Sequence, residues 1–517
     1  MRQASPTQWT LLFELPEHPG LTLQARLRLA MVQAISDGRL APGAPLPSSR
    51  ELSRLLALSR NTVTAAYEQL VDEGFLEARA RSGVFVAADA LSTPVALPPS
   101  RAEPRGRPPD WAARVRRSLA DRRTLAKPDQ WRDYAYPFVY GTFDAELFPT
   151  DEFRECCTRA LTRAQLPQWA VDFETEDLPE LVEQIRQRVL PKRGVFALAD
   201  EILVTVGAHQ ACHLLADALF DADTRLGFEE PGHPHARNTF ALRAPQIAPL
   251  ALDAQGLRVD ALPALDYLYV TPSHQSPTTA TLPLARRQQL LRRAEAEDFV
   301  IIEDDYEAEN LYAGAPMPAL KSLDRSGRVI YIGSLAKSLA PALRLGYIVA
   351  PRALVAELRL LRHAMVRHPS AFLQQAWALF ISLGHHESHA RRVNQAMRGR
   401  LQVAAEALHR HLPDFACSMP QGGASLWVQA PPWVDGGELA LMARGHGVLI
   451  EPGDVFFAQP PYPCPCFRLR LSSIPAAKIE PGIAELARAV DELAAARGAR
   501  RFAPAPGGHR PGDAGVH

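Results

Sequence analysis

The feature that most limits how this chain can fold is a change of composition between residues 89 and 132. This stretch is rich in proline and arginine, with ten Lys or Arg against four Asp or Glu between Ser92 and Arg132, so it has too little apolar surface for a core. The 517 residues of the chain also exceed what one hydrophobic core usually serves. We therefore predict two domains, at 20–88 and 133–497, a linker at 89–132, and a disordered Gly- and Pro-rich tail at 498–517.

The bulk composition excludes several classes of protein. No apolar run approaches the roughly 20 residues of a membrane span, and the N-terminus has the acidic, proline-broken character that a signal peptide lacks. We expect a cytoplasmic protein that does not enter a membrane. Six cysteines give neither a disulfide framework nor paired metal-ligand spacing. Cys464 and Cys466 could ligate a metal, but without a second ligand pair a structural role is favoured, and we predict no metal.

Residues 20–88 have the pattern of a winged helix-turn-helix. Apolar residues recur at helical spacing from Leu23 until Gly38 interrupts the pattern. Ser48 and Ser59 each have the position of an N-cap before a further helix. Segments 75–79 and 84–86 then indicate two strands that meet in a basic hairpin tip, which would form the wing.

This arrangement predicts how the first domain reaches double-stranded DNA. In a helix-turn-helix the third helix enters the major groove with its N-terminal residues forward, while the second helix offers free N–H groups to phosphate. The residues assigned to DNA on this basis are Ser48, Ser49, Arg50, Arg60, Asn61, Thr62, Arg81, Ser82 and Gly83. A dimerisation or protein-binding module is the alternative. The segments LPSSREL, LSRNTV, AYEQL and EGF, in that order, resemble the GntR superfamily and favour DNA.

The second domain alternates short apolar strands with helices. Strands are predicted at 202–206, 267–270, 299–302 and 329–332, which indicates a mostly parallel sheet covered by helices on both faces. Ligands bind such sheets at the carboxyl ends of their strands.

Polar residues follow several of these strands. Ala208 and His209 open a helix whose free N–H groups could hold a phosphate. The glycine at the turn before them is weak evidence by itself, because glycine is common at any strand-to-helix turn. Asp304 lies in the run EDDY at a strand end, where a buried carboxylate needs a cationic partner, either a protonated ring nitrogen or a nearby arginine. Lys337 follows another strand, and a desolvated lysine amine there is the type that condenses with an aldehyde.

Taken together, these residues supply what pyridoxal 5'-phosphate needs: an amine, a carboxylate, a phenol, a phosphate cradle and a ring-stacking group. The segments EEPGHP, TPSHQSPTT, IIEDDYE, YIGSLAKSLAPALRLGY and FRLRLSS resemble the aminotransferase-like domain of fold type I. The whole chain thus resembles the MocR/GabR-type transcription regulators. The resemblance implies an N-terminal winged helix-turn-helix, mainly α with a β-hairpin wing, and an α/β fold type I PLP-dependent aminotransferase-like domain.

The resemblance also implies a role for each site residue. Lys337 would form the Schiff base with the cofactor, Asp304 would meet the pyridinium nitrogen and Tyr306 the phenolic oxygen. The remaining cofactor residues would be Ala208, His209, Ser334 and Arg344 at the phosphate and His233 over the ring. The effector-binding residues would be Arg468, Tyr140, Gly141 and His235.

The sequence departs from the family at several of these positions. His233 stands where a ring-stacking tyrosine is usual, and His209 replaces a usual glutamine. His235 stands where a relative has a second effector-binding arginine, for which Arg237 is a candidate substitute. The family's PTG is replaced by PTT at 277–279.

The function predicted from these features is PLP-dependent control of transcription. An amino compound would be sensed through aldimine exchange at Lys337, in a head-to-tail homodimer implied by the family. Two alternatives stay open: an active PLP-dependent aminotransferase, and a regulator for which PLP itself is the signal. The basic linker either contacts flanking DNA phosphates, through Arg114, Arg116, Arg117, Arg122 and Arg123, or is a solvated tether.

Overall fold

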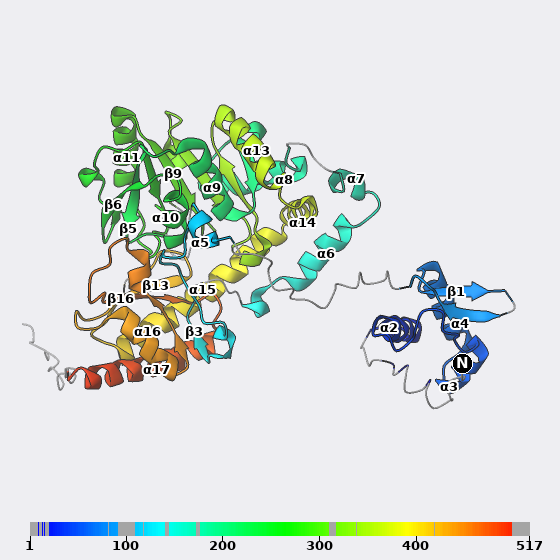
Figure 1. The fold of residues 1–517 in the computed structure, drawn as a ribbon. Helices are drawn as coiled ribbons and strands as arrows, with labels where there is room; N and C mark the ends of the chain where they lie inside the picture. The colour runs from blue at the N-terminus through cyan, green and yellow to red at the C-terminus, as the bar shows by residue number, and fades with distance from the viewer. Residues whose placement is uncertain are drawn as a thin grey trace, which may run out of the picture. The chain divides into compact units, whose positions relative to one another are not determined.

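The computed structural model of the chain describes residues 9, 13, 15, 20–80, 82–90, 109–116, 118–139, 144–171, 176–309, 317–337, 339–417 and 419–498 (Figure 1). Contacts divide the chain into two compact units, Met1–Val115 and Arg116–His517. In the part of the chain that the structure describes, no helix combines the length and apolar character needed to span a bilayer.

The N-terminal unit combines a helix-turn-helix with a β-hairpin. Its elements are α2 (Leu23–Ser36), α3 (Ser49–Leu55), α4 (Arg60–Asp72), β1 (Leu76–Arg79), β2 (Gly83–Val86) and α5 (Trp111–Arg114). Both predicted caps form: the Ser48 side chain accepts the N–H of Glu51 at 3.2 Å, and that of Ser59 accepts the N–H of Thr62 at 3.1 Å. β1 and β2 pair antiparallel. The predicted winged helix-turn-helix is therefore confirmed.

One apolar core holds this unit together. It is formed by side chains of all three main helices and both strands, among them Leu27, Met31, Leu52, Val63 and Val86. Burial of these side chains stabilises the unit by roughly 1.5–3 kcal/mol each, so α3 and α4 are held firmly enough to present their exposed N-termini.

Among the described residues, the large unit is built on an eight-stranded sheet with the order β4-β11-β10-β9-β8-β5-β6-β7. The strands are β4 (Ile202–Thr205), β5 (Arg225–Glu230), β6 (Gln246–Asp253), β7 (Gly256–Leu257), β8 (Tyr267–Val270), β9 (Val300–Asp305), β10 (Val329–Ser334) and β11 (Gly346–Val349). The pairs from β10 across to β6 are parallel, whereas β11 is antiparallel to both of its neighbours. The predicted mostly parallel sheet is present, but the sequence analysis did not identify β5, β6, β7 or β11.

Helices cover both faces of this sheet (Figure 1). Among those packed on the sheet are α9 (Gly207–Leu219) and α13 (Arg352–Val366) on one face, with α11 (Leu284–Glu297) and α14 (Ala371–Ser382) on the other. The further helices of this part are α6 (Thr150–Ala160), α7 (Leu166–Trp169), α8 (Pro179–Gln184), α10 (Pro234–Phe240) and α12 (Leu320–Leu323). The polar residues predicted at the strand ends are thus held by a sheet that is packed on both faces.

A second, smaller sheet follows, in the order β12-β13-β16-β15. Its strands are β12 (Ala416–Cys417), β13 (Ser425–Gln429), β15 (Glu451–Pro452) and β16 (Cys466–Arg470), and its helices are α15 (His385–His411), α16 (Gly436–Gly445) and α17 (Ala476–Ala496). β3 (Tyr136–Pro137) pairs in parallel with β14 (Val448–Leu449), which joins the start of the large unit to its C-terminal part.

The boundary between the two units falls inside the predicted linker. The second half of that linker packs on the large unit, since the Asn238 amide donates to the Arg123 carbonyl at 2.9 Å. Arg122 and Arg123 line a cavity there with Arg237. Residues 91–108, Arg117 and the predicted tail from 499 lie outside the described residues.

Candidate functional site

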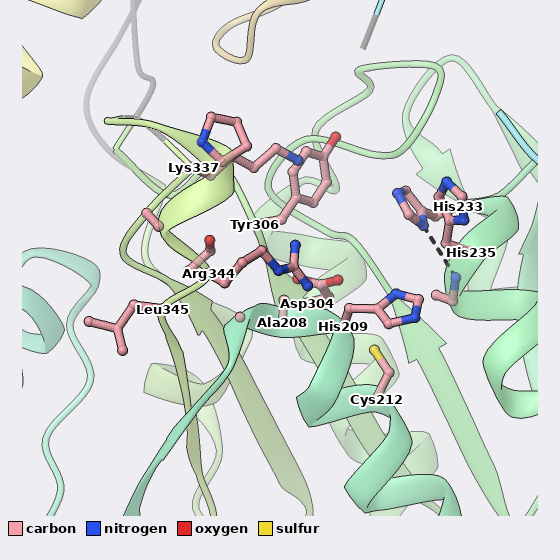
Figure 2. Close-up of a pocket in the computed structure, with 15 residues that line it drawn as sticks. Ala208, His209, Cys212, His233, His235, Asp304, Tyr306, Lys337, Arg344 and Leu345 are labelled. Carbon is pink, nitrogen blue, oxygen red and sulfur yellow. Dashed lines mark hydrogen bonds between the residues drawn. The ribbon is translucent and has the colours of Figure 1, made fainter. Parts of the chain in front are cut away.

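Most of the predicted cofactor- and effector-binding residues surround one cavity of about 290 Å³ at the carboxyl ends of β4, β9 and β10 (Figure 2). Because β11 is antiparallel to both β4 and β10, these two strands end at the same edge of the sheet as β9. The predicted residues that line the cavity are Ala208, His209, His233, His235, Asp304, Tyr306, Ser334, Lys337 and Arg344.

One end of the cavity has the properties of an anion site. Gly207, with φ of +72°, turns the chain from β4 directly into α9, and no side chain of the described residues caps this helix. The N–H groups of the first helical turn therefore have no partner within the helix and point at the cavity edge. Arg344 lies over the same turn, at the edge of the cavity (Figure 2). A Cβ atom built at Gly207 would lie 3.3 Å from the Arg344 Cζ atom.

The run of three carboxylates resolves into three different roles. Glu303 accepts the backbone N–H groups of residues 320 and 321, both at 2.7 Å. Asp305 pairs with the Arg193 guanidinium at 2.8 Å. Asp304 lines the cavity, where its Oδ2 accepts the Tyr269 hydroxyl at 2.6 Å and its buried Oδ1 has no hydrogen-bond partner among the described residues. Burial raises the pKa of Asp304. Asp304 thus offers one oxygen to a cationic ligand.

The Lys337 amine lies deep in the same cavity. Its Nζ atom is 3.8 Å from the centre of the Tyr306 ring and 4.0 Å from Oε1 of Glu307. Burial lowers the pKa of Lys337, although Glu307 opposes this effect. Burial also raises the pKa of the Tyr306 phenol. A lysine with a lowered pKa has more of the neutral amine that acts as a nucleophile.

The sequence analysis missed a buried ion pair beside this lysine. Glu307 and Arg470 form a salt bridge in which the side chains are 2% and 7% exposed. The Ala424 N–H also donates to Glu307, at 3.2 Å. Burial by itself would raise the pKa of Glu307, but Arg470 and Lys337 outweigh it and lower that pKa to about 2. The sequence shows only that Glu307 directly follows Tyr306. This position does not indicate which residue Glu307 pairs with.

Histidines form one side of the cavity. The His233 Nδ1 accepts the N–H of Ala236 at 3.3 Å, as the N-cap of α10, which places the ring proton on Nε2 (Figure 2). The ring centres of His233 and His235 are 5.6 Å apart, and those of His209 and His235 are 6.2 Å apart. Burial lowers the pKa of His209 to about 4 and that of His233 well below its usual value. Both rings are therefore neutral at pH 7.

The predicted effector residues have different outcomes. Arg468 is buried, with its Nε donating to Glu451 at 2.6 Å and its Nη2 without a partner among the described residues. It contributes to the lowered pKa of both His233 and His235, so its charge acts on the cavity. Tyr140 and Gly141, by contrast, lie outside the described residues.

Arg237, the candidate substitute for a missing effector arginine, does not line the cavity that contains Lys337. Its guanidinium donates to the backbone carbonyls of Val455 and Phe456 at 3.0 and 2.9 Å and lies 3.9 Å from Glu230. These groups hold Arg237 at a second cavity, of about 410 Å³, instead of the one that contains Lys337.

The predicted DNA-binding residues that the structure describes lie at the starts of α3 and α4 and at the start of β2. Arg50, Arg60 and Asn61 are exposed at the N-termini of α3 and α4, whereas the Thr62 hydroxyl is held by Ser59 at 2.8 Å. The hairpin tip and the start of α3 face one groove, which is lined by Ser48, Ser49, Ser82 and Gly83 among others. Arg81 lies outside the described residues.

Family models match both units. The model for bacterial regulatory proteins of the gntR family matches residues 23–86, and that for aminotransferase class I and II matches residues 150–486. Among the solved structures similar to this chain is LysN, an alpha-aminoadipate aminotransferase from Thermus thermophilus, complexed with N-(5'-phosphopyridoxyl)-L-leucine. The TM-score is 0.68 and the identity 26%, over 75% of this chain and 99% of LysN.

Relatives that span almost the whole chain are transcription regulators. The HTH-type transcriptional regulator TauR of Rhodobacter capsulatus is 42% identical over 91% of this chain and 96% of its own length. The probable rhizopine catabolism regulatory protein MocR of Rhizobium meliloti is 31% identical over 83% of this chain and 86% of its own length. These relatives share both units in the same order.

Proposed function

This chain belongs to the bacterial transcription regulators that join a gntR-family helix-turn-helix to a class I and II aminotransferase domain, and from this premise we propose that it binds pyridoxal 5'-phosphate and controls transcription in response to a primary amine. The observation that carries the proposal is the convergence, in one cavity, of the desolvated Lys337 amine and the unpartnered Oδ1 of Asp304.

The residues of the cavity fit this cofactor. A buried carboxylate oxygen without a partner is costly unless a cationic group meets it, and the protonated pyridine nitrogen is such a group. The uncapped start of α9, with Ser334 and Arg344, would hold the phosphate. Gly346 lets β11 pass close to the turn that starts α9, because a Cβ atom there would lie 2.9 Å from the Gly207 carbonyl carbon.

When bound, pyridoxal phosphate supplies an aldehyde that condenses with primary amines. The Lys337 amine would hold the aldehyde carbon and yield this position to the amine of an effector. Tyr306, whose phenol keeps its proton because burial raises its pKa, would donate to the cofactor's phenolic oxygen. Arg468, with its unpartnered Nη2, would bind an acidic group of the effector.

The N-terminal unit would carry the output. The exposed side chains at the start of α4 would reach base edges, and the N-terminus of α3 would meet a phosphate. In the head-to-tail homodimer that we propose from the family, exchange of Lys337 for the effector would change the balance between two arrangements of the DNA-binding units.

Absorbance spectra of the full-length protein test this function. Wild type should retain a visible absorbance band after addition of cofactor and gel filtration, and Lys337→Ala should lose it. Lys321→Ala is the matched control, because this lysine pairs with Asp324 away from the cavity. An unchanged band in Lys337→Ala would show that the aldehyde is held elsewhere.

A second measurement separates regulation from enzymatic turnover. Binding to DNA from upstream of the protein's own gene is followed by fluorescence anisotropy while a panel of amines is titrated. We expect one class of amine to change both the visible band and the DNA affinity in wild type, and neither in Lys337→Ala. Sustained conversion of amine and keto acid, with no change in DNA affinity, would favour an aminotransferase, and a response to cofactor alone would make the cofactor the signal.

A further inference from the structure

Two cysteines at the start of β16 lie in contact. The Cys466 N–H donates to the Cys464 carbonyl at 2.9 Å across Pro465, which makes a three-residue turn. In an extended strand, residues two apart point the same way but lie well separated. The turn instead brings the two Sγ atoms to 3.5 Å. This contact is the property that the Cys-Pro-Cys sequence did not reveal.

Hydrogen bonds with Asp435 and Gly436 and close packing at Gly453 fix the turn. Asp435 accepts the Cys464 N–H at 2.9 Å, and the Gly436 N–H donates to the Cys464 carbonyl at 2.9 Å. A Cβ atom built at Gly453 would lie 2.5 Å from the Cys466 Sγ. The sulfurs are therefore held together by their surroundings, and neither can easily rotate away from the other.

The two thiols differ in acidity. The hydrogen bond from Cys466 lowers the pKa of Cys464, whereas the same bond, with burial, raises the pKa of Cys466. Both side chains are buried, at 1% and 3% exposure, but Pro463 and Pro465, which flank Cys464, are partly exposed. The pair thus lies close to the surface, and a small shift of this turn would admit a small oxidant.

We propose that Cys464 and Cys466 form a reversible dithiol site that hydrogen peroxide oxidises to a disulfide. The Cys464 thiolate attacks one peroxide oxygen, the O–O bond breaks, and the departing hydroxide takes up the proton that Cys464 released. The Cys466 sulfur then attacks the sulfenic acid at Cys464, and the S–O bond breaks as water leaves with the Cys466 proton. In total, two thiols and one peroxide give one disulfide and two waters.

Oxidation at this site has a path to the cavity. A disulfide needs a sulfur separation of about 2.05 Å, so the pair must close from 3.5 Å. Cys466 and Arg468 lie on the same face of β16, and the adjacent Gly453 begins the turn that ends at Phe456, over whose ring the Arg468 guanidinium lies at 4.7 Å. Closure therefore acts on the segment that positions Arg468.

Peptide mapping of the full-length protein tests the site. Reduced protein is treated with peroxide, quenched with N-ethylmaleimide and digested. We expect the peptide with both cysteines to lack the label and two hydrogen atoms, and to regain both thiols after dithiothreitol. Cys464→Ser and Cys466→Ser should each abolish this product, and Cys417→Ser should leave it unchanged. If a variant fails to fold, the peptide map of the wild-type protein alone still shows whether the disulfide forms.

Two outcomes would overturn the proposal. In the first, both thiols remain labelled at a peroxide dose that oxidises the partly exposed Cys157. In the second, Cys464 and Cys466 are oxidised separately to sulfinic acids without a disulfide. Because the map reads covalent state alone, it is independent of cofactor and DNA, and its failure leaves the proposed function untouched.

Discussion

The buried pair of Glu307 and Arg470 makes a quantitative prediction about the large unit. The structure lowers the pKa of Glu307 from 4.5 to about 2, which corresponds to about 3 kcal/mol at about 1.4 kcal/mol for each pH unit. Replacing Arg470 by methionine removes the charged partner and leaves the buried carboxylate beside the Lys337 amine and the Ala424 N–H. We expect Arg470→Met to lower the free energy of unfolding by about 3–5 kcal/mol, the cost of breaking a buried pair by removing one partner.

The pH dependence has a definite sign. Because the folded-state pKa of Glu307 lies below the unfolded value, its stabilising contribution is fully present above pH 4.5 and is lost as the pH falls towards about 2. Glu307→Gln should remove this part of the acid sensitivity. Wild type should therefore lose more stability than the variant over this range of pH.

Urea unfolding at pH 7, followed by tryptophan fluorescence, measures the effect. Five of the seven tryptophans lie in the large unit, so the signal reports mainly on it. A double-mutant cycle with Glu307→Gln and Arg470→Met should give a coupling free energy of about 2–3 kcal/mol. The control is Glu438→Gln, which removes a surface pair with Arg497 and should cost less than about 1 kcal/mol. A coupling near zero, or an Arg470→Met effect no larger than the control, would refute the reasoning.

Three further predictions concern other parts of the chain. Ser59→Ala should destabilise the start of α4 by about 1 kcal/mol through loss of its N-cap, seen as faster amide hydrogen exchange in α4 but not in α2. Gly346→Ala should displace the turn at Gly207 and weaken cofactor retention, because its Cβ would lie 2.9 Å from the Gly207 carbonyl carbon and 3.0 Å from the Ala208 nitrogen; unchanged retention would contradict the assigned phosphate end. His209 has a folded pKa of about 4 against 6.5 unfolded, so the unfolded chain binds more protons between these values and stability rises with pH there. His209→Gln should flatten this rise in thermal midpoints measured across the range, and an equal rise in the variant would assign it to other groups.

Much of the architecture follows from local sequence. The caps at Ser48 and Ser59 depend on side chains that reach N–H groups three residues away. Short apolar runs such as 267–270 form buried strands, and the polar and turn-forming residues on either side mark where these strands begin and end. The positions of Asp304 and Lys337 at strand ends were therefore predictable, and parallel strands bring such ends to one edge.

Only the tertiary structure decided which partner each polar group meets. The run EDDY offers three carboxylates, and their roles diverge because Arg193 reaches Asp305 while Asp304 alone faces the cavity. Arg237 is turned to two backbone carbonyls, and β11 enters the sheet antiparallel between β4 and β10. These outcomes depend on contacts between residues far apart in the chain.

The sequence by itself determined the elements and the residues at their ends, because hydrogen bonds and periodicity within an element are local. The pairing of Glu307 with Arg470, 163 residues apart, was decided by folding, since a buried charge takes whichever partner the packed core places beside it.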